Sequence, residues 1–251
     1  MKKFLSVLFV FVLALACVAC DNTPNVSEGE NNSNVSTEAG DESVADNSEA
    51  EVKVMTYAEF VAAELDTLVC VETYVQAKQS WWENKGTFYT QNEEGAYFLY
   101  DMPCTEEEYN ALTVGTKIRV TGYKAEWSGE VEITEAKFEV LEGSYVAEPI
   151  DVTDLLGTDE LIEKQNMYVS FNDLTIEKIE YKNGEAGDDI YVTVSKDGTE
   201  YSFCVERYLT APDTDVYKAF AELTQGDVVD IEGFLYWYNG VNTHITSVAK
   251  N

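Results

Sequence analysis

Two stretches of the chain follow one pattern, and this repeat constrains the fold more than any other feature. Residues 115–134 read GTKIRVTGYKAEWSGEVEIT, and residues 226–246 read GDVVDIEGFLYWYNGVNTHIT. A repeat of this kind indicates that one structural unit occurs twice. We therefore predict two similar domains, 53–147 and 148–251. With one residue inserted, the matching positions are Gly115 with Gly226, Gly122 with Gly233, Trp127 with Tyr238, Gly129 with Gly240, and Ile133-Thr134 with Ile245-Thr246.

Each copy reads as three strands, a short helix and two further strands. Alternating apolar residues predict the strands, which we place at 68–77, 87–91, 96–102, 117–123 and 130–140 in the first copy and at 168–179, 190–194, 201–205, 228–237 and 241–248 in the second. The helices follow threonine N-caps, which predict helices at 105–112 and 214–223. A further helical stretch precedes each copy, at 57–65 with a Thr56/Glu59 capping box and at 160–165 after Thr158.

This order of elements is that of the OB-fold, a five-stranded Greek-key barrel. The chain resembles OB-fold domains of the nucleic-acid-binding, tRNA-anticodon-binding-like type in secreted and lipid-anchored bacterial proteins. The resemblance covers nearly all of 53–251, and it implies an all-β fold with minor α content, arranged as two tandem barrels. It also implies a ligand face on the second and third strands, flanked by the 1–2 and 4–5 loops. A β-sandwich is the alternative, but the helix between the third and fourth strands argues against it.

The N-terminus has the features of an export signal. Lys2 and Lys3 precede an apolar run, FLSVLFVFVLALA, which is too short to span a membrane as a helix. The CVACDN that follows resembles the lipobox of bacterial lipoproteins, which implies a signal peptide at 1–20 and acylation, such as palmitate, on Cys20. We thus expect a lipoprotein on the outer face of the cytoplasmic membrane. Acylation of Cys17, or a plain signal peptide cleaved near Ala19, remains as an alternative.

An acidic linker follows the proposed anchor. Residues 21–52 are mostly Asn, Ser, Glu, Asp, Thr and Gly, with nine acidic residues and no basic ones. Such a segment cannot bury enough apolar surface to fold, so we predict a disordered tether. A coil of this length spans on the order of 30 Å.

The charge of the chain limits the kinds of ligand that it can attract. The net charge is −31 overall and −24 over residues 53–251. A charge of this sign repels polyphosphates at long range, although it also serves simply to keep an envelope protein soluble. Cys70, Cys104 and Cys204 are the cysteines of this part. We expect small buried thiols, and the alternative is a disulfide between Cys70 and Cys104.

Aromatic residues suggest where a ligand binds. Trp81 and Trp82 stand side by side in the polar 1–2 loop, just before a Lys85-Gly86 pair that we predict as a turn, and Trp127 lies in the 4–5 loop. Bases stack on aromatic side chains, and sugar rings stack in a similar way. We predict that Trp81, Trp82, Lys85, Trp127 and Lys124 form the ligand-binding face. The alternative is that one tryptophan caps the barrel and the other packs on a helix or on the other copy.

Catalytic motifs find little support in the sequence. The single histidine, His244, lies in a predicted strand, where a structural role is usual. The sequence has no phosphate-binding glycine loop, no Cys/His metal spacing and no nucleophile elbow. Glu185, Asp188 and Asp189 suggest a Ca²⁺ loop, but their spacing differs from that of an EF-hand, so a solvated turn is the better interpretation. We predict a chain that is not an enzyme and needs no cofactor or metal.

Two functions remain compatible with these features. One is a lipid-anchored binding protein whose first barrel binds single-stranded nucleic acid or glycan. The other is an envelope interaction protein that docks another protein through its exposed aromatic residues. Binding of an oligonucleotide should weaken steeply with salt, whereas docking through aromatic residues should not.

Overall fold

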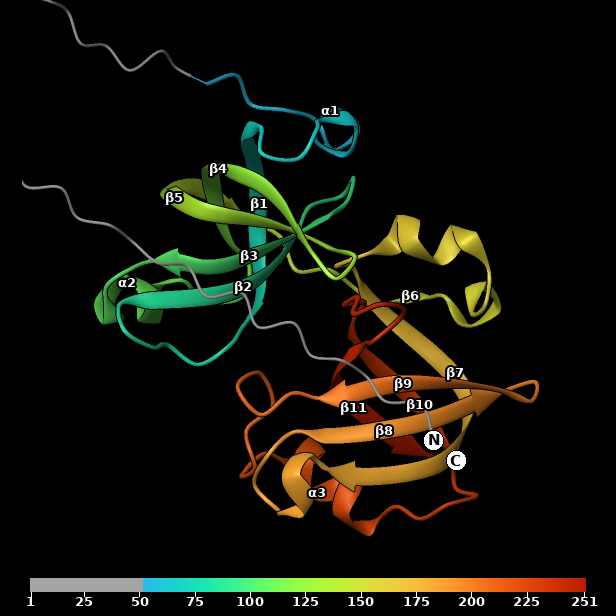
Figure 1. Ribbon diagram of the computed structural model, residues 1–251. Coiled ribbons are helices and arrows are strands. Elements are labelled where there is room, and N and C mark those ends of the chain that lie inside the picture. Colours follow the sequence, from blue (N-terminus) through green and yellow to red (C-terminus); the bar gives the residue numbers. More distant parts are fainter. Residues whose placement is uncertain (1–51) are drawn as a thin grey trace, which may run out of the picture. The chain divides into compact units, whose positions relative to one another are not determined.

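The computed structural model describes residues 52–251, which are coloured in Figure 1. Cys20, the signal peptide and the acidic linker up to residue 51 lie outside the described residues. Within the described part, no helix is both long and apolar enough to cross a membrane.

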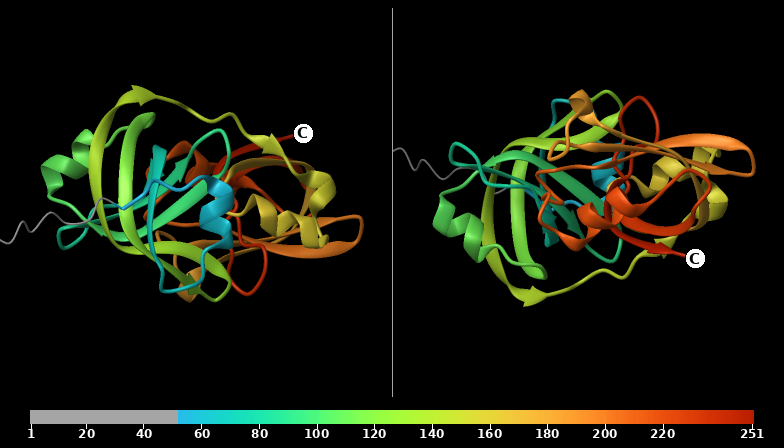
Figure 2. Two further views of the ribbon diagram at one scale, coloured as in Figure 1. Left: turned by 90° about the horizontal axis from the view of Figure 1, so that it is seen from above. Right: turned by 90° about the horizontal axis from the view of Figure 1, so that it is seen from below.

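The first half forms a closed barrel of five strands. In chain order these are β1 (Leu68–Lys78), β2 (Lys85–Gln91), β3 (Ala96–Pro103), β4 (Thr116–Trp127) and β5 (Glu130–Ser144). The strands follow the order β1-β2-β3-β5-β4 around the ring, and only the β3–β5 pair is parallel. Helix α2 (Glu106–Ala111) joins β3 to β4. Helix α1 (Tyr57–Ala62) lies at one end of the ring, as Figure 2 shows from above, and places Phe60 in the barrel core.

The second half repeats this arrangement. Its strands are β7 (Tyr168–Tyr181), β8 (Ile190–Lys196), β9 (Thr199–Val205), β10 (Val228–Phe234) and β11 (His244–Lys250), and α3 (Asp215–Glu222) joins β9 to β10. The sheet order is β10-β11-β9-β8-β7, and β10 also pairs with β7, which closes the ring. The short strand β6 (Ile150–Asp151) adds a parallel pair to β7. Turns of 3-10 helix, η1 (Thr153–Leu155), η2 (Asp159–Lys164) and η3 (Lys182–Gly184), complete this half.

Two OB-fold barrels, mostly β with minor α, are therefore confirmed. The strand order 1-2-3-5-4-1 with a helix between strands three and four occurs in both halves. Both predicted capping threonines in the first half, Thr56 and Thr105, form complete capping boxes. The domain boundary at 147/148 stays a prediction.

Two predicted elements differ in detail from the structure. The helical stretch predicted at 160–165 is present as the 3-10 helix η2, but the side chain of Thr158 makes no capping hydrogen bond there. The fourth strand of the second copy ends at Phe234, before the predicted end at Trp237. The reason is that the backbone N–H of Trp237 donates to a glutamate of the first barrel, Glu130, instead of continuing a strand ladder.

Each barrel has its own apolar core. Inward-facing valines of β1 and the inward-facing residues of β8 and β10 are fully buried, which follows from the alternation of their sequences. Cys70, Cys104 and Cys204 are buried free thiols, as we expected. The Cys70–Cys104 disulfide is therefore not formed.

Candidate functional site

The usual ligand face of the first barrel is covered by the second barrel. Tyr89 on β2 and Phe98 on β3 point outward from the ring and form an apolar cluster with Phe234 of β10. The rings of Tyr89 and Phe234 stack with centroids 4.5 Å apart. The ring of Tyr236 also covers this face, and its centroid lies 5.4 Å from that of Phe98. No large ligand can lie on this part of the face without separating the barrels.

Polar contacts fix this seam between the barrels. The backbone N–H of Tyr168 donates to Gln91 Oε1 at 2.8 Å. The Tyr89 hydroxyl hydrogen-bonds to Nδ1 of His244, whose ring stacks on Tyr236. Burial lowers the pKa of His244 to about 3, so its imidazole is neutral. His244 therefore has the structural role that we expected from its place in a strand.

The equivalent face of the second barrel is open around Tyr191, whereas Cys204 beside it is buried. The strand pairings show which residues of the two barrels are equivalent. In the first barrel Tyr89 pairs with Phe98, and Phe98 pairs with β5. In the second barrel Tyr191 pairs with Cys204, and Cys204 pairs with β11. Tyr191 is thus the counterpart of Tyr89. The Tyr89 residue is 0% exposed, whereas Tyr191 is 41% exposed. One of two matched tyrosines is covered and the other faces solvent.

Small hydroxyl side chains follow Tyr191 along this face, and Tyr191 itself lies opposite Cys204 of β9 and Glu180 of β7. Ile190, Val192 and Val194 of β8 point into the core, so the residues between them point outward. Thr193 lies opposite Ser202 of β9, and Ser195 lies opposite Glu200. We call the outward side chains of these two strands the β8–β9 face; they are Tyr191, Thr193, Ser195, Glu200, Ser202 and Cys204.

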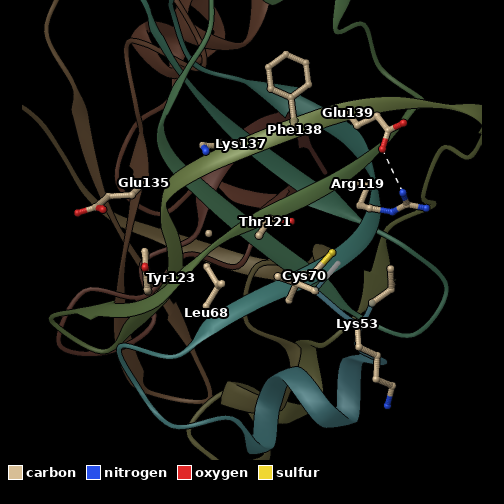
Figure 3. A pocket seen from close by; sticks show the side chains of 13 residues that line it. Lys53, Leu68, Cys70, Arg119, Thr121, Tyr123, Glu135, Lys137, Phe138 and Glu139 are labelled. Carbon is tan, nitrogen blue, oxygen red and sulfur yellow. Dashed lines mark hydrogen bonds and ion pairs between the residues drawn. The ribbon is translucent and has the colours of Figure 1, made fainter. Parts of the chain in front are cut away.

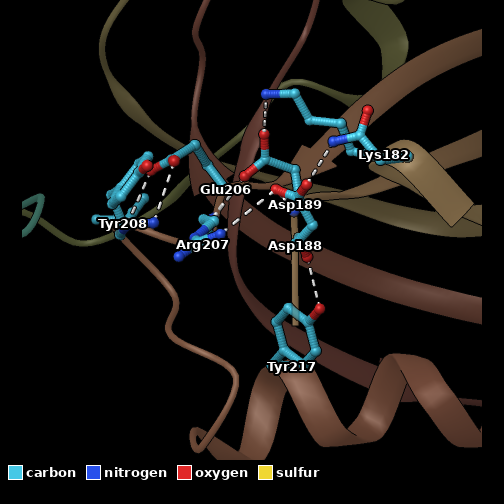
Figure 4. Close-up of polar contacts among 9 residues, drawn as sticks. Lys182, Asp188, Asp189, Glu206, Arg207, Tyr208 and Tyr217 are labelled. Carbon is cyan, nitrogen blue, oxygen red and sulfur yellow. Dashed lines mark hydrogen bonds and ion pairs between the residues drawn. The ribbon is translucent and has the colours of Figure 1, made fainter. Parts of the chain in front are cut away.

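A network of ion pairs forms one rim of the β8–β9 face, as Figure 4 shows. Lys182 Nζ lies 2.8 Å from Asp189 Oδ2, and the backbone N–H of Arg207 donates to the other oxygen of Asp189 at 3.1 Å. The side chain of Arg207 lies 3.7 Å from Asp188. Both rim cations therefore have carboxylate partners.

Glu206 is a buried residue whose hydrogen bonds stabilise the same rim. Its two oxygens accept the backbone N–H groups of Tyr208 at 3.0 Å and Leu209 at 2.9 Å. Burial raises the pKa of Glu206 to about 7, and the charge of Asp189 adds to the shift. These hydrogen bonds hold the loop that presents Tyr208, which is exposed.

In the 184–190 loop, which we interpreted as a solvated turn rather than a Ca²⁺ site, Asp188 and Asp189 accept hydrogen bonds from protein donors. Asp189 accepts from Lys182, as described above, and Asp188 accepts from the amide of Asn183 at 2.8 Å. The Tyr217 hydroxyl of α3 donates to the backbone carbonyl of Asp188. Among residues 52–251, no group of three or more His, Cys, Asp or Glu side chains is placed to hold a metal ion.

The two adjacent tryptophans have different environments. The indole N–H of Trp81 donates to the Cys104 carbonyl at 3.0 Å, and its ring packs on the core of the first barrel. Trp82 is 72% exposed. Trp81 thus caps the barrel, as the alternative interpretation had it for one tryptophan, whereas Trp82 is exposed rather than packed on a helix or on the other copy.

The turn between β1 and β2 lies earlier than the sequence suggested. Glu83 and Asn84 have positive φ angles of 47° and 61°, and Trp82 and Lys85 exchange two backbone hydrogen bonds around them. This is a two-residue hairpin turn, so Lys85 belongs to β2 rather than to the turn. The Lys85 ammonium is paired with Asp101 at 3.2 Å.

The hairpin tip with Trp82 reaches the rim of the second barrel. The backbone N–H of Ser80 donates to the Tyr208 carbonyl at 2.8 Å, and the Ser80 hydroxyl lies 3.3 Å from the same oxygen. Trp82 therefore lies two residues from a backbone hydrogen bond to Tyr208, a residue of the other barrel. Both Trp82 and Tyr208 are exposed.

The other predicted site residues lie elsewhere. Lys124 comes directly after Tyr123, which pairs with Leu68 at the start of β1. Trp81 and Trp82, in contrast, come after the end of β1. At about 3.3 Å per residue, the strand between them is roughly 30 Å long. The predicted set is therefore split between two ends of the barrel. Trp127, 62% exposed, lies on the Lys124 side.

Lys124 has a structural role in place of the predicted ligand contact. Its ammonium donates to the carbonyls at the end of α1, to Phe60 at 3.0 Å, Val61 at 2.9 Å and Ala63 at 2.7 Å. These three bonds use every donor of a lysine. The sequence contained a signal for this role. Lys124 lies an even number of residues after Ile118 and Val120, so on β4 it faces the barrel interior as they do.

A separate groove lies on the outer surface of β1, β4 and β5, shown in Figure 3. Its volume is about 1060 Å³. Leu68 and Tyr123 expose apolar surface there. Arg119 is paired with Glu72 and Glu139, whereas Lys137 has no ion-pair partner among residues 52–251.

Comparison with known proteins adds solved structures of low similarity. A murine DNA-binding protein bound to double-stranded DNA is 12% identical, with a TM-score of 0.36, over 72% of this chain and 96% of that chain. The Ifi202 HINa domain in complex with 20-bp double-stranded DNA is 12% identical, with a TM-score of 0.35, over 74% and 98%. A replication protein A heterotrimer bound to single-stranded DNA is 11% identical, with a TM-score of 0.31, over 73% and 49%.

At this level of likeness, none of the three structures indicates which ligand this chain binds. No family model and no curated protein matches the chain.

Proposed function

We propose that the chain is a lipid-anchored, non-catalytic binding protein of the cell envelope that holds an oligomeric ligand on the β8–β9 face. One observation carries the proposal: of two equivalent tyrosines, Tyr89 is covered by the other barrel and Tyr191 is open. The face around Tyr191 is the one on which OB-folds bind oligosaccharides and oligonucleotides. The first barrel contributes Trp82 at the rim, instead of offering its own face.

The chemistry of the face favours a glycan. Tyr191, Tyr208 and Trp82 give exposed rings, and Thr193 and Ser202 give hydroxyl groups next to Tyr191 along β8 and β9. Lys182 and Arg207 are already paired with aspartates, so they leave little positive charge for phosphates. The net charge of −24 over residues 53–251 adds repulsion of polyanions.

A binding screen tests this function. The full chain in detergent is titrated with neutral cell-wall oligosaccharides and with single-stranded oligonucleotides at two salt concentrations. We expect saturable binding of an oligosaccharide that changes little with salt. Oligonucleotide binding that falls steeply with salt would favour single-stranded nucleic acid as the ligand. Failure of every oligomer to bind would contradict the proposal.

The anchor makes a separate prediction. Since acylation of Cys20 supplies about 0.8 kcal/mol per buried CH₂ group, Cys20→Ser should release the protein from the membrane into the medium. Fractionation of cells followed by immunoblotting measures this release. A Cys20→Ser chain that stays on the membrane, with release by Cys17→Ser instead, would place the lipid on Cys17.

A second candidate function is docking of a partner protein in the groove of Figure 3. The exposed Leu68 and Tyr123 favour a partner segment that carries an apolar side chain. Lys137, which has no ion-pair partner within residues 52–251, favours a carboxylate on that segment. Binding of such a protein that survives Tyr191→Ala but is lost in Leu68→Glu would support this candidate over the oligomer-binding function.

A further inference from the structure

A carboxyl group without a partner lies on the outer surface of the first barrel, beside the seam. Glu132 of β5 pairs with Phe98 of β3, which points outward from the ring, so Glu132 points outward as well. Glu132 is only 8% exposed. Within residues 52–251, its carboxyl group forms no hydrogen bond and no ion pair. A nearly buried acceptor without a donor is costly, so its position needs an explanation.

Two tyrosines lie beside this carboxyl group on the β3 side. Tyr100 follows Phe98 by two residues and is on the same face, and the two rings stack with centroids 6.4 Å apart. Tyr236 of the β10–β11 loop packs edge-on against the same Phe98 ring. Burial raises the pKa of both tyrosine hydroxyl groups, and the charge of Glu132 adds to both shifts. Both hydroxyl groups are therefore close enough to Glu132 for its charge to act on them.

A tryptophan lies on the other side of the carboxyl group, on β4. Glu132 pairs there with Ala125, whose side chain is small. Trp127 is two residues beyond Ala125 on the same face, at a diagonal position about 7 to 8 Å from Glu132 that an aromatic side chain can bridge. Tyr100 and Trp127 are both exposed, so open rings stand on the strands at either side of Glu132. We call this group the Glu132 corner; it consists of Glu132, Tyr100, Tyr236 and Trp127.

The charges at the Glu132 corner favour a cation. Asp101, directly after Tyr100, is a second carboxylate near Glu132, and the neighbouring ammonium of Lys85 is paired with Asp101. The face of an aromatic ring also attracts cations, and that of tryptophan does so best. Ca²⁺ takes about six to eight oxygen ligands, which is more than this corner offers. A carboxylate beside aromatic rings suits an organic ammonium group instead.

We propose that the Glu132 corner binds an organic ammonium group, which donates a hydrogen bond to Glu132 and lies against the rings of Tyr100 and Trp127. The ammonium group supplies the donor and the opposite charge that Glu132 lacks. A group of this size does not need the covered part of the face around Tyr89. The site is separate from that of the proposed function, since the β8–β9 face takes a neutral oligomer and this corner takes a cation.

Ionisation of Glu132 makes the binding depend on pH. Burial raises the pKa of Glu132 to about 7, and the charge of Asp101 adds to the shift. The ionisable groups around it are Asp101 and Tyr100 of β3, Lys85 of β2, Glu130 of β5 and Tyr236 of the β10–β11 loop. From β4, Ala125 and Trp127 face it without charge. Because an ammonium group binds the ionised carboxylate, its affinity should rise with pH, by up to about tenfold per unit, and level off above about pH 7.

Titration of the full chain in detergent tests the proposal. The probes are butylammonium, Nα-acetyl-lysine amide and, as the uncharged control, 1-butanol, and NMR of the probe follows the binding. We expect both ammonium probes to bind saturably and butanol not to bind. The tighter of the two ammonium probes indicates whether a free amine or a lysine side chain is the better ligand. Binding of butanol equal to that of butylammonium, or no binding of either ammonium probe, would overturn the proposal.

Two variants locate the binding in the Glu132 corner. Glu132→Gln keeps the shape of the side chain and removes its charge, so we expect a loss of affinity of about tenfold or more and no rise with pH. Trp127→Ala should weaken binding by about two- to fivefold, as expected for a cation–π contact at an exposed site. Because Trp127 is exposed, Trp127→Ala should fold even if Glu132→Gln does not. Affinity equal to that of the wild type in Trp127→Ala would contradict the proposed site.

Glu126→Gln is the matched control for the loss of charge. Glu126 precedes Trp127 on β4, but its partner Val131 packs on the barrel core, so Glu126 is on the opposite face of the strand. We expect Glu126→Gln to bind both ammonium probes with the affinity of the wild type. Equal losses from Glu126→Gln and Glu132→Gln would mean that only the overall negative charge attracts the probes, which would overturn the proposal.

Discussion

Replacing both Trp82 and Tyr191 by alanine should weaken ligand binding by about 2 to 6 kcal/mol while leaving the stability nearly unchanged. Stacking on one aromatic side chain contributes about 1 to 3 kcal/mol, and the proposal uses two of them. Both residues are exposed, at 72% and 41%, and surface substitutions of this kind change stability by roughly 0.5 kcal/mol or less. Calorimetric titration with the oligomer found in the screen measures the loss, and thermal unfolding checks the fold.

Trp127→Ala is the matched control for this double variant. Trp127 is 62% exposed, as a solvent-facing indole of the same barrel, but it lies at the other end of β1. We expect its affinity to equal that of the wild type. Equal losses from Trp127→Ala and from the double variant would mean that the ligand does not lie on the β8–β9 face.

Tyr89→Ala should give the opposite result, a large loss of stability. Tyr89 is 0% exposed, and it packs on Phe98 and Phe234 in the seam. Truncating a buried aromatic residue costs about 3 to 5 kcal/mol. In a protein of this size, that corresponds to a fall of roughly 6 to 20 °C in the thermal midpoint. Thermal unfolding followed by circular dichroism measures the fall.

Tyr89→Phe separates the hydroxyl group from the ring. It keeps the packing but leaves Nδ1 of His244 without its partner, which costs about 1 to 3 kcal/mol. We therefore expect Tyr89→Phe to lie between the wild type and Tyr89→Ala in thermal stability. A Tyr89→Ala protein as stable as the wild type would show that the seam does not form in solution.

Local features of the sequence predicted most of the fold. The strands follow from residues that alternate between core and surface, such as Val69, Val71 and Val75 on β1, which are all fully buried. The helices follow from capping residues such as Thr105. These signals lie within a few residues of each other, so one sequence is enough to read them.

The site could be predicted only in part, because it depends on contacts between distant segments. The packing of Trp81 on the first barrel depends on the carbonyl of Cys104, which lies 23 residues further along the chain. Tyr191 is the one aromatic residue of β8, which reads IYVTVSK, and nothing within that strand distinguishes it from Tyr89. One signal was available: β3 reads AYFLY and is apolar on both faces, which is typical of a strand covered on both sides.

The central claim is that the tandem arrangement covers one ligand face and leaves its counterpart open. Tyrosine-selective chemical labelling of the full chain, read out by mass spectrometry, tests this claim most directly. We expect modification of Tyr191 but not of Tyr89, and protection of Tyr191 when the ligand is bound. Labelling of Tyr89 in the folded protein, or a Tyr191 that the bound ligand leaves unprotected, would contradict the account.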